Sequence, residues 1–88
     1  MLDPHRLRVF RSVVASGSVQ AAADNLGLTS SAVSQHVAAL QRETGLTLFH
    51  RAGRGIAPTE AALALVERTD EVMSRWGELD QAVADLRE

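Results

Sequence analysis

The chain has 88 residues, a formal net charge of −2, no cysteine and only three aromatic side chains. This length suits one small domain without a disulfide or cysteine-based zinc site, and the scarce aromatics disfavour all-β folds and base-stacking modules for single-stranded nucleic acid. Since no apolar run could cross a membrane and no secretory leader opens the chain, we expect a cytoplasmic domain without metal or cofactor, too small for an enzyme's cleft.

The first predicted element is an amphipathic helix over residues 3–15. Asp3 can cap its N-terminus, with Pro4 at the first helical position. Apolar residues recur at helical spacing, which indicates a buried face: Leu7, Phe10, Val13 and Val14. Three arginines fall on the outer face: Arg6, Arg8 and Arg11. Gly17 is expected to end this helix.

A second, shorter helix is predicted over residues 18–26. Ser18 is its expected N-cap, and its free N-terminal amides could also bind a phosphate oxygen. The alanine run 21–23 is small enough to let another helix approach closely. Gly27 closes the helix, as expected where the chain must adopt a left-handed conformation.

A third helix is predicted from its N-cap Thr29 to about Thr44, and Gly45 stops it. Its buried stripe follows helical spacing: Val33, Val37 and Leu40. The opposite face carries Ser31, Gln35, Ala38 and Arg42, with Ser34 on the flank. These side chains are short and polar at the N-terminal end of the helix, and the first acid within the helix is Glu43. A helix face that meets only water usually carries Glu and Lys, so this face is a candidate contact surface.

Residues 46–51 are predicted to form a strand, residues 52–55 a turn and residues 56–58 a second strand. The result is a small hairpin. It carries Arg51 and Arg54 near its tip, where flexible cations could enter a flanking minor groove of DNA.

The final predicted helix, capped by Thr59, has Glu60 at the favourable positive end of its dipole. Apolar positions repeat every seven residues in two series, and we expect these to mediate self-association: Leu65, Thr69, Val72, Trp76, Leu79, Val83 and Leu86. A helix of roughly 27 residues is about 40 Å long, more than the preceding body could cover. Its far half therefore needs a partner, and a second copy is favoured over an absent domain.

The charge is divided unevenly along the chain. Residues 1–55 carry six arginines against three acids, a balance of +3, whereas residues 56–88 carry three arginines against eight acids, a balance of −5. The basic part contains a helix, the tight turn 27–29 and a second helix, which is the core of a helix-turn-helix DNA reader. We therefore predict a mainly α, winged helix-turn-helix domain over 1–58, with the helix-turn-helix at about 18–44 and the wing at about 46–58, and a dimerisation helix over 59–88.

Residues 5–60 resemble the N-terminal domain of LysR-type transcriptional regulators. The landmarks include Leu7, Phe10, Gly17-Ser18, Ala22-Ala23, Leu26, Ser31-Ala32-Val33-Ser34, Leu40, Gly45, Leu48-Phe49, Arg51 and Thr59-Glu60. The resemblance implies a linker helix that pairs with its twin, and binding of double-stranded DNA as a homodimer, or as a tetramer of a longer protein, at interrupted palindromes. It also implies a small-molecule effector bound only by a C-terminal domain that this chain lacks, so the chain is expected to be a fragment.

The residues predicted to contact DNA are Ser18, Thr29, Ser30, Ser31, Ser34, Gln35, His36, Arg42, Arg51 and Arg54. Gln35 can pair with adenine, whereas Ser30, in the first turn, could touch either a base or a phosphate. For His36, packing or a phosphate contact is favoured over base reading, and Arg51 could instead be a structural ion-pair partner. Many LysR-type members have Gln where this chain has Ser30 and Arg where it has Gln35, so their base preference does not transfer.

Two other readings of the residues stay open. The chain could be a coiled-coil interaction module with a degenerate helix-turn-helix, or a winged-helix regulator of another family such as the MarR type. An enzyme is disfavoured, because the sequence shows no nucleophile–base pair, paired carboxylates or phosphate loop, and His50 has no such partner beside it.

Overall fold

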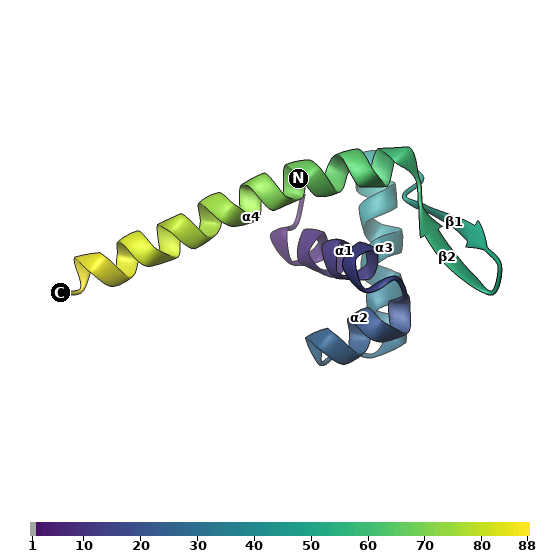
Figure 1. Cartoon of the computed structure of the whole chain (residues 1–88), viewed down its shortest axis with the longest axis horizontal. Helices are drawn as coiled ribbons and strands as arrows, with labels where there is room; N and C mark the ends of the chain where they lie inside the picture. Colours follow the sequence, from purple (N-terminus) through teal and green to yellow (C-terminus); the bar gives the residue numbers. More distant parts are fainter. Residues whose placement is uncertain (1) are drawn as a thin grey trace.

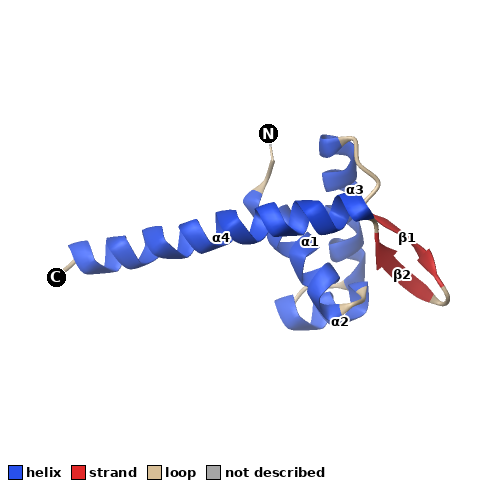
Figure 2. Ribbon diagram, turned by 45° about the horizontal axis from the view of Figure 1, so that its top comes forward, coloured by secondary structure: helices blue, strands red, loops and turns tan. Residues whose placement is uncertain are grey.

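The computed structural model describes residues 2–88, so Met1 of the predicted domain 1–58 lies outside the described residues. Its elements in order are α1 (Pro4–Ser16), α2 (Val19–Leu26), α3 (Ser30–Thr44), β1 (Phe49–Ala52), β2 (Gly55–Pro58) and α4 (Glu60–Leu86). Helices α1–α3 pack together, the hairpin projects from one end, and α4 extends past the body at the other (Figures 1 and 2). The predicted mainly α, winged helix-turn-helix fold is confirmed.

Each helix begins at the cap expected from the sequence. The side chain of the capping residue accepts a hydrogen bond from a backbone amide of the first turn in every case, at 2.9–3.1 Å: Asp3, Ser18, Thr29 and Thr59. Gly27 ends α2 with φ +67°, a left-handed conformation that a side chain would strain. Gly27 and the N-cap Thr29 together fix the short turn between α2 and α3, and therefore the angle between these two helices.

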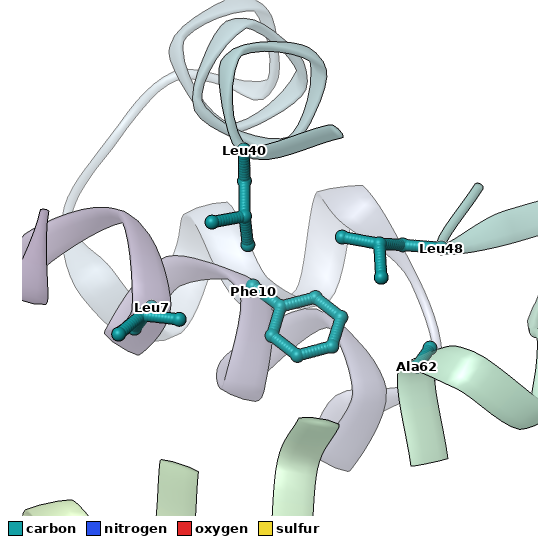
Figure 3. Close-up of a cluster of buried hydrophobic side chains, with 5 residues drawn as sticks. All are labelled: Leu7, Phe10, Leu40, Leu48 and Ala62. Carbon is teal, nitrogen blue, oxygen red and sulfur yellow. The ribbon is translucent and has the colours of Figure 1, made fainter. Parts of the chain in front are cut away.

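The core consists of two clusters that both involve α1 and α3. One joins α1, α3 and α4 through Leu7, Phe10, Leu40, Leu48 and Ala62, whose side chains converge in Figure 3. The other joins α1, α2 and α3 through Val9, Val13, Ala22, Ala23 and Val33. Phe49 packs against both, with its ring centroid 5.8 Å from that of Phe10 in an edge arrangement. Helix α3 is thus held in place by both clusters.

The segment between α3 and the hairpin differs from the prediction. Residues 46–48 were expected to begin a strand, but β1 starts only at Phe49. Leu48 is buried in the core, and its amide donates to Oε1 of Gln41 at 2.8 Å. Its carbonyl accepts from the amide of Thr59 at 3.0 Å, and Oγ1 of Thr59 donates to the carbonyl of Thr47 at 2.7 Å. These backbone groups bond to α3 and to the start of α4 instead of to a strand.

The hairpin turn is tighter than the predicted turn over residues 52–55. Ala52 pairs with Gly55 in the antiparallel register, which leaves Gly53 and Arg54 as a two-residue loop. Gly53 has φ +59° while Arg54 has no positive φ, the pattern of a type II′ turn with glycine at its first central position. Arg54 therefore occupies the very tip of the wing.

Helix α4 has a body-facing section and a free section. Its inner face packs against α1 and the adjoining core through Ala62, Leu65, Val66, Thr69 and Met73. Thr69 is only 2% exposed, and its hydroxyl donates to the carbonyl of Leu65 at 2.8 Å. Two residues predicted for self-association, Leu65 and Thr69, therefore contact their own domain, because α1 covers this part of α4.

Candidate nucleic-acid interface

Helix α3 presents one face to the core and the opposite face to solvent. Val33, Ala39 and Leu40 are buried. The predicted contact residues Ser31, Ser34, Gln35 and Arg42 are exposed on the outer side, and Ala38 and His36 are half-buried. Helices α1 and α2 pack against α3 and leave these four exposed side chains accessible to a ligand.

Polar side chains surround the start of α3. Thr29 is exposed, and its Oγ1 accepts from the amide of Ala32 at 3.0 Å. The hydroxyl of Ser30 donates to Oε1 of Gln20 at 2.7 Å, and Nε2 of Gln20 donates to Oδ1 of Asp24 at 2.9 Å. The beginning of α3 is thereby tied to α2 through side chains as well as through the turn.

Gln35 and Ser31 lie one turn apart on the exposed face. Nε2 of Gln35 donates to Oγ of Ser31 at 3.5 Å, a long hydrogen bond that an incoming base could replace. The amide of Gln35 has both a donor and an acceptor, which adenine can engage together in the major groove. Ser34, on the flank, is exposed beside them.

A hollow of about 430 Å³ runs beside the middle of α3 and is lined by Arg6, Ala32, Gln35, His36, Ala38, Ala39 and Arg42. The ring of His36 meets that of His5 edge-on, with centroids 4.9 Å apart and planes at 88°. The packing role expected for His36 thus has a concrete partner on α1. Arg42 lines the same hollow and forms no ion pair within residues 2–88.

The wing carries two exposed arginines. Arg51 lies on β1 and Arg54 at the turn, and both are exposed. In the described part of the chain neither forms an ion pair, so the structure provides no carboxylate partner for Arg51. By contrast, Arg6 pairs with Glu43, and Arg11 lies 3.6 Å from Asp70. Two of the three arginines of α1 therefore link helices instead of simply facing solvent.

Ser18 and the start of α2 lie at the edge of this surface. Ser18 is half-buried and caps α2, so its hydroxyl is already engaged with the amide of Ala21. Gln20 and Asp24 were not identified from the sequence. Their spacing of four residues places both on one side of α2, but only the packing of α2 against α3 brings Gln20 to Ser30.

The free section of α4 exposes an apolar stripe. Its members are 41–85% exposed: Val72, Trp76, Leu79, Val83 and Leu86. A shallow hollow of about 430 Å³ lies on this stripe, lined by Glu71, Val72, Arg75, Trp76 and Leu79. A row of large apolar side chains on a helix that projects from the body is unusual for a surface that stays in water.

Across residues 2–88, no helix combines the length and apolar character needed to cross a membrane. The same residues contain no group of three or more histidine or acidic side chains placed to hold a metal ion.

Comparison with known proteins identifies the fold and the family. A family model described as "Bacterial regulatory helix-turn-helix protein, lysR family" matches residues 4–63. An HTH-type transcriptional regulator of Mycobacterium tuberculosis is 46% identical over 72 residues, which cover 82% of this chain and 22% of that protein. The chain thus spans about a fifth of this relative's length.

Solved structures share the fold of this chain. The BenM DNA-binding domain in complex with catB site 1 DNA superposes with a TM-score of 0.93 at 22% identity, covering 99% of this chain and 97% of that chain. The CbnR DNA-binding domain in a complex with DNA superposes with a TM-score of 0.80 at 29% identity, covering 94% and 99%.

Proposed function

Because the chain belongs to the LysR family of bacterial regulatory helix-turn-helix proteins, we propose that it binds double-stranded DNA sequence-specifically, as the DNA-binding part of a transcription regulator. The observation that carries this proposal is the outer face of α3, where Ser31, Ser34 and Gln35 stand exposed without an acidic neighbour in the first three turns. The family match also decides against a winged-helix regulator of the MarR type.

In this proposal α3 enters the major groove. Its width admits an α-helix, and Gln35 and the serines reach base edges from the N-terminal half of the helix. The free amides at the starts of α2 and α3 can bind phosphate oxygens, which supports contacts near Ser18 and Thr29. His36 and Arg42, beside the hollow, contact the DNA backbone.

The wing supplies a second kind of contact. Arg51 and Arg54 have exposed guanidinium groups free of ion pairs in the described chain, so they can bind phosphates or enter a flanking minor groove. The BenM and CbnR DNA-binding domains, which share this fold, are solved in complex with DNA, which supports DNA binding by this chain.

We also propose that the chain acts as a homodimer through the stripe of Val72, Trp76, Leu79, Val83 and Leu86 on α4. A two-fold dimer presents two copies of α3 to two inverted half-sites. Effector binding and assembly into tetramers would belong to parts of a longer protein. The role is one of binding instead of catalysis, and we place it in the cytoplasm, at the nucleoid.

The test is selection of binding sites from randomised duplex DNA by the purified chain at near-physiological salt. Two inverted half-sites at fixed spacing are the expected product. Recovery of unenriched DNA that is released by higher salt would reduce the function to phosphate attraction. Retention of no DNA even at low salt would overturn the proposal in favour of an interaction module with a degenerate helix-turn-helix.

A further inference from the structure

Three polar side chains form a chain of hydrogen bonds across the turn between α2 and α3. Oγ of Ser30 donates to Oε1 of Gln20 at 2.7 Å, and Nε2 of the same amide donates to Oδ1 of Asp24 at 2.9 Å. Ser30 is the first residue of α3, so this chain ends where the helix meets DNA in the proposed function.

The carboxylate of Asp24 determines the direction of both bonds. An ionised carboxylate only accepts hydrogen bonds, so the amino group of the Gln20 amide must face it. The reverse orientation of the amide would place two acceptor oxygens 2.9 Å apart. The carbonyl oxygen of Gln20 therefore faces Ser30, and because this oxygen also only accepts, the single hydroxyl proton of Ser30 must point to it.

We propose that Asp24 and Gln20 are positioning residues that make Ser30 a hydrogen-bond acceptor toward DNA. With its proton engaged, Ser30 offers only lone pairs. It therefore favours an exocyclic amine in the major groove, N6 of adenine or N4 of cytosine, over the acceptors O4 of thymine and O6 of guanine. Phosphate oxygens also only accept, so Ser30 reads a base instead of the backbone. The inference rests on the proposed function, since it assigns a specificity to the same interface.

The neighbouring serine has the opposite polarity. Ser31 accepts from Nε2 of Gln35 at 3.5 Å, which leaves its own proton free. Ser31 can therefore donate to a phosphate or to a base acceptor, whereas Ser30 cannot do so without breaking its bond to Gln20. The matched control is a second Gln–Asp pair with the same four-residue spacing, on α4 and outside the proposed DNA interface: Nε2 of Gln81 donates to Oδ1 of Asp85 at 3.0 Å.

The first experiment selects sites from randomised duplex DNA with the wild-type chain and with Ser30→Ala. The position whose preference disappears in Ser30→Ala is the one read by Ser30, and we expect adenine or cytosine there. The exocyclic amine is then deleted at that position, with purine for adenine or 2-pyrimidinone for cytosine. Wild-type affinity should fall by about three- to tenfold, the worth of one hydrogen bond, while Ser30→Ala should be insensitive to the deletion.

The second experiment tests the positioning residues on the same duplexes. Gln20→Ala releases the hydroxyl of Ser30, and Asp24→Asn lets the Gln20 amide turn over, so both variants should accept thymine or guanine at this position. Their ratio of affinities for amine over keto bases should approach one. Gln81→Ala and Asp85→Asn, the same two changes in the pair on α4, should retain the wild-type ratio. Ser30→Thr, which keeps the hydroxyl that Ser30→Ala removes, should retain it as well. Gln20→Met preserves the length of the side chain and should behave as Gln20→Ala does.

Two outcomes would overturn the inference while leaving the proposed function intact. Ser30→Ala could weaken binding to all sequences equally, which is the behaviour of a phosphate contact. Alternatively, Gln20→Ala and Asp24→Asn could retain the wild-type base ratio, so that neither residue sets the polarity of Ser30. Failure of the wild-type chain to bind any duplex is a separate result and overturns the proposed function itself.

Discussion

Gln35 and Arg54 lie on different parts of the proposed interface, and their side chains differ in chemistry. Gln35 is on the outer face of α3, where its amide supplies a donor and an acceptor with fixed geometry, held only by the 3.5 Å bond to Ser31. Arg54 is at the tip of the wing, where its cation has no carboxylate partner within residues 2–88. The fixed geometry of an amide such as that of Gln35 can discriminate between bases, whereas the charge of an exposed guanidinium such as that of Arg54 attracts any phosphate.

We predict that Gln35→Ala relaxes base preference at one operator position by about 1–3 kcal/mol, because a bidentate contact is lost. Affinity for unrelated DNA should change little. The measurement is binding of a selected operator and its single-base variants, followed by fluorescence anisotropy. An equal loss for every sequence would assign Gln35 to the DNA backbone.

We predict that Arg54→Ala weakens binding to all sequences and lowers the slope of log K against log salt by about 1, because one phosphate contact is lost. Arg87→Ala, the same charge change at the far end of α4, is the control and should leave the slope unchanged. Titrations at several salt concentrations, with a selected and an unrelated duplex, provide the measurement. A loss confined to one base position would argue against this role.

At the scale of elements, the wing is held in place by α3 and α4 together. Leu48 fills the core between them, its buried amide donates to Gln41, and its carbonyl accepts from Thr59. Since β1 begins directly after Leu48, these bonds set the direction in which the hairpin leaves the body. A glutamate at position 41 could supply the same acceptor oxygen.

We predict that Gln41→Ala lowers the free energy of unfolding by about 1–3 kcal/mol, because the buried amide of Leu48 loses its acceptor. Gln41→Glu retains an acceptor oxygen and should remain closer to the wild-type value. Urea denaturation at fixed protein concentration, followed by circular dichroism, measures both. Equal stability of Gln41→Ala and the wild type would mean that water replaces this bond without cost.

At the scale of the whole molecule, the shape is elongated, with extents of 52 × 25 × 19 Å, because α4 extends well beyond the rest of the domain. The wing and the free end of α4 lie at opposite ends of the molecule (Figures 1 and 2). In the proposed dimer, pairing of two copies through the exposed stripe leaves both wings free. The acids on the projecting end of α4 are also held far from the wing and its arginines.

We predict that Leu79→Glu prevents the proposed dimerisation and leaves a monomer, because it places a charge in the centre of the apolar stripe. Leu63→Glu is the matched control, since Leu63 is also about half exposed on α4 but lies about 160° around the helix. Analytical ultracentrifugation measures the association state. In the same variant, affinity for an inverted repeat should fall toward that for a single half-site, and an unchanged dimer would contradict the assigned interface.

The sequence by itself was sufficient to predict the order of elements, the four capping residues and the family resemblance. Caps and helical periods depend on residues within one or two turns of each other, so local chemistry encodes them. The outward position of Gln35 and the exposed position of Arg54 could be predicted for the same reason.

Only the tertiary structure decided which parts of these elements are covered. Leu65 continues the seven-residue series of Val72 and Leu79, and Thr69 continues that of Trp76 and Val83. Both are nevertheless covered by their own domain, because coverage depends on where another helix crosses α4 and not on the period. Likewise, the contact of Gln20 with Ser30 and the bond from Leu48 to Gln41 join different elements. Such contacts depend on the packing of the whole domain, and no local pattern in the sequence specifies them.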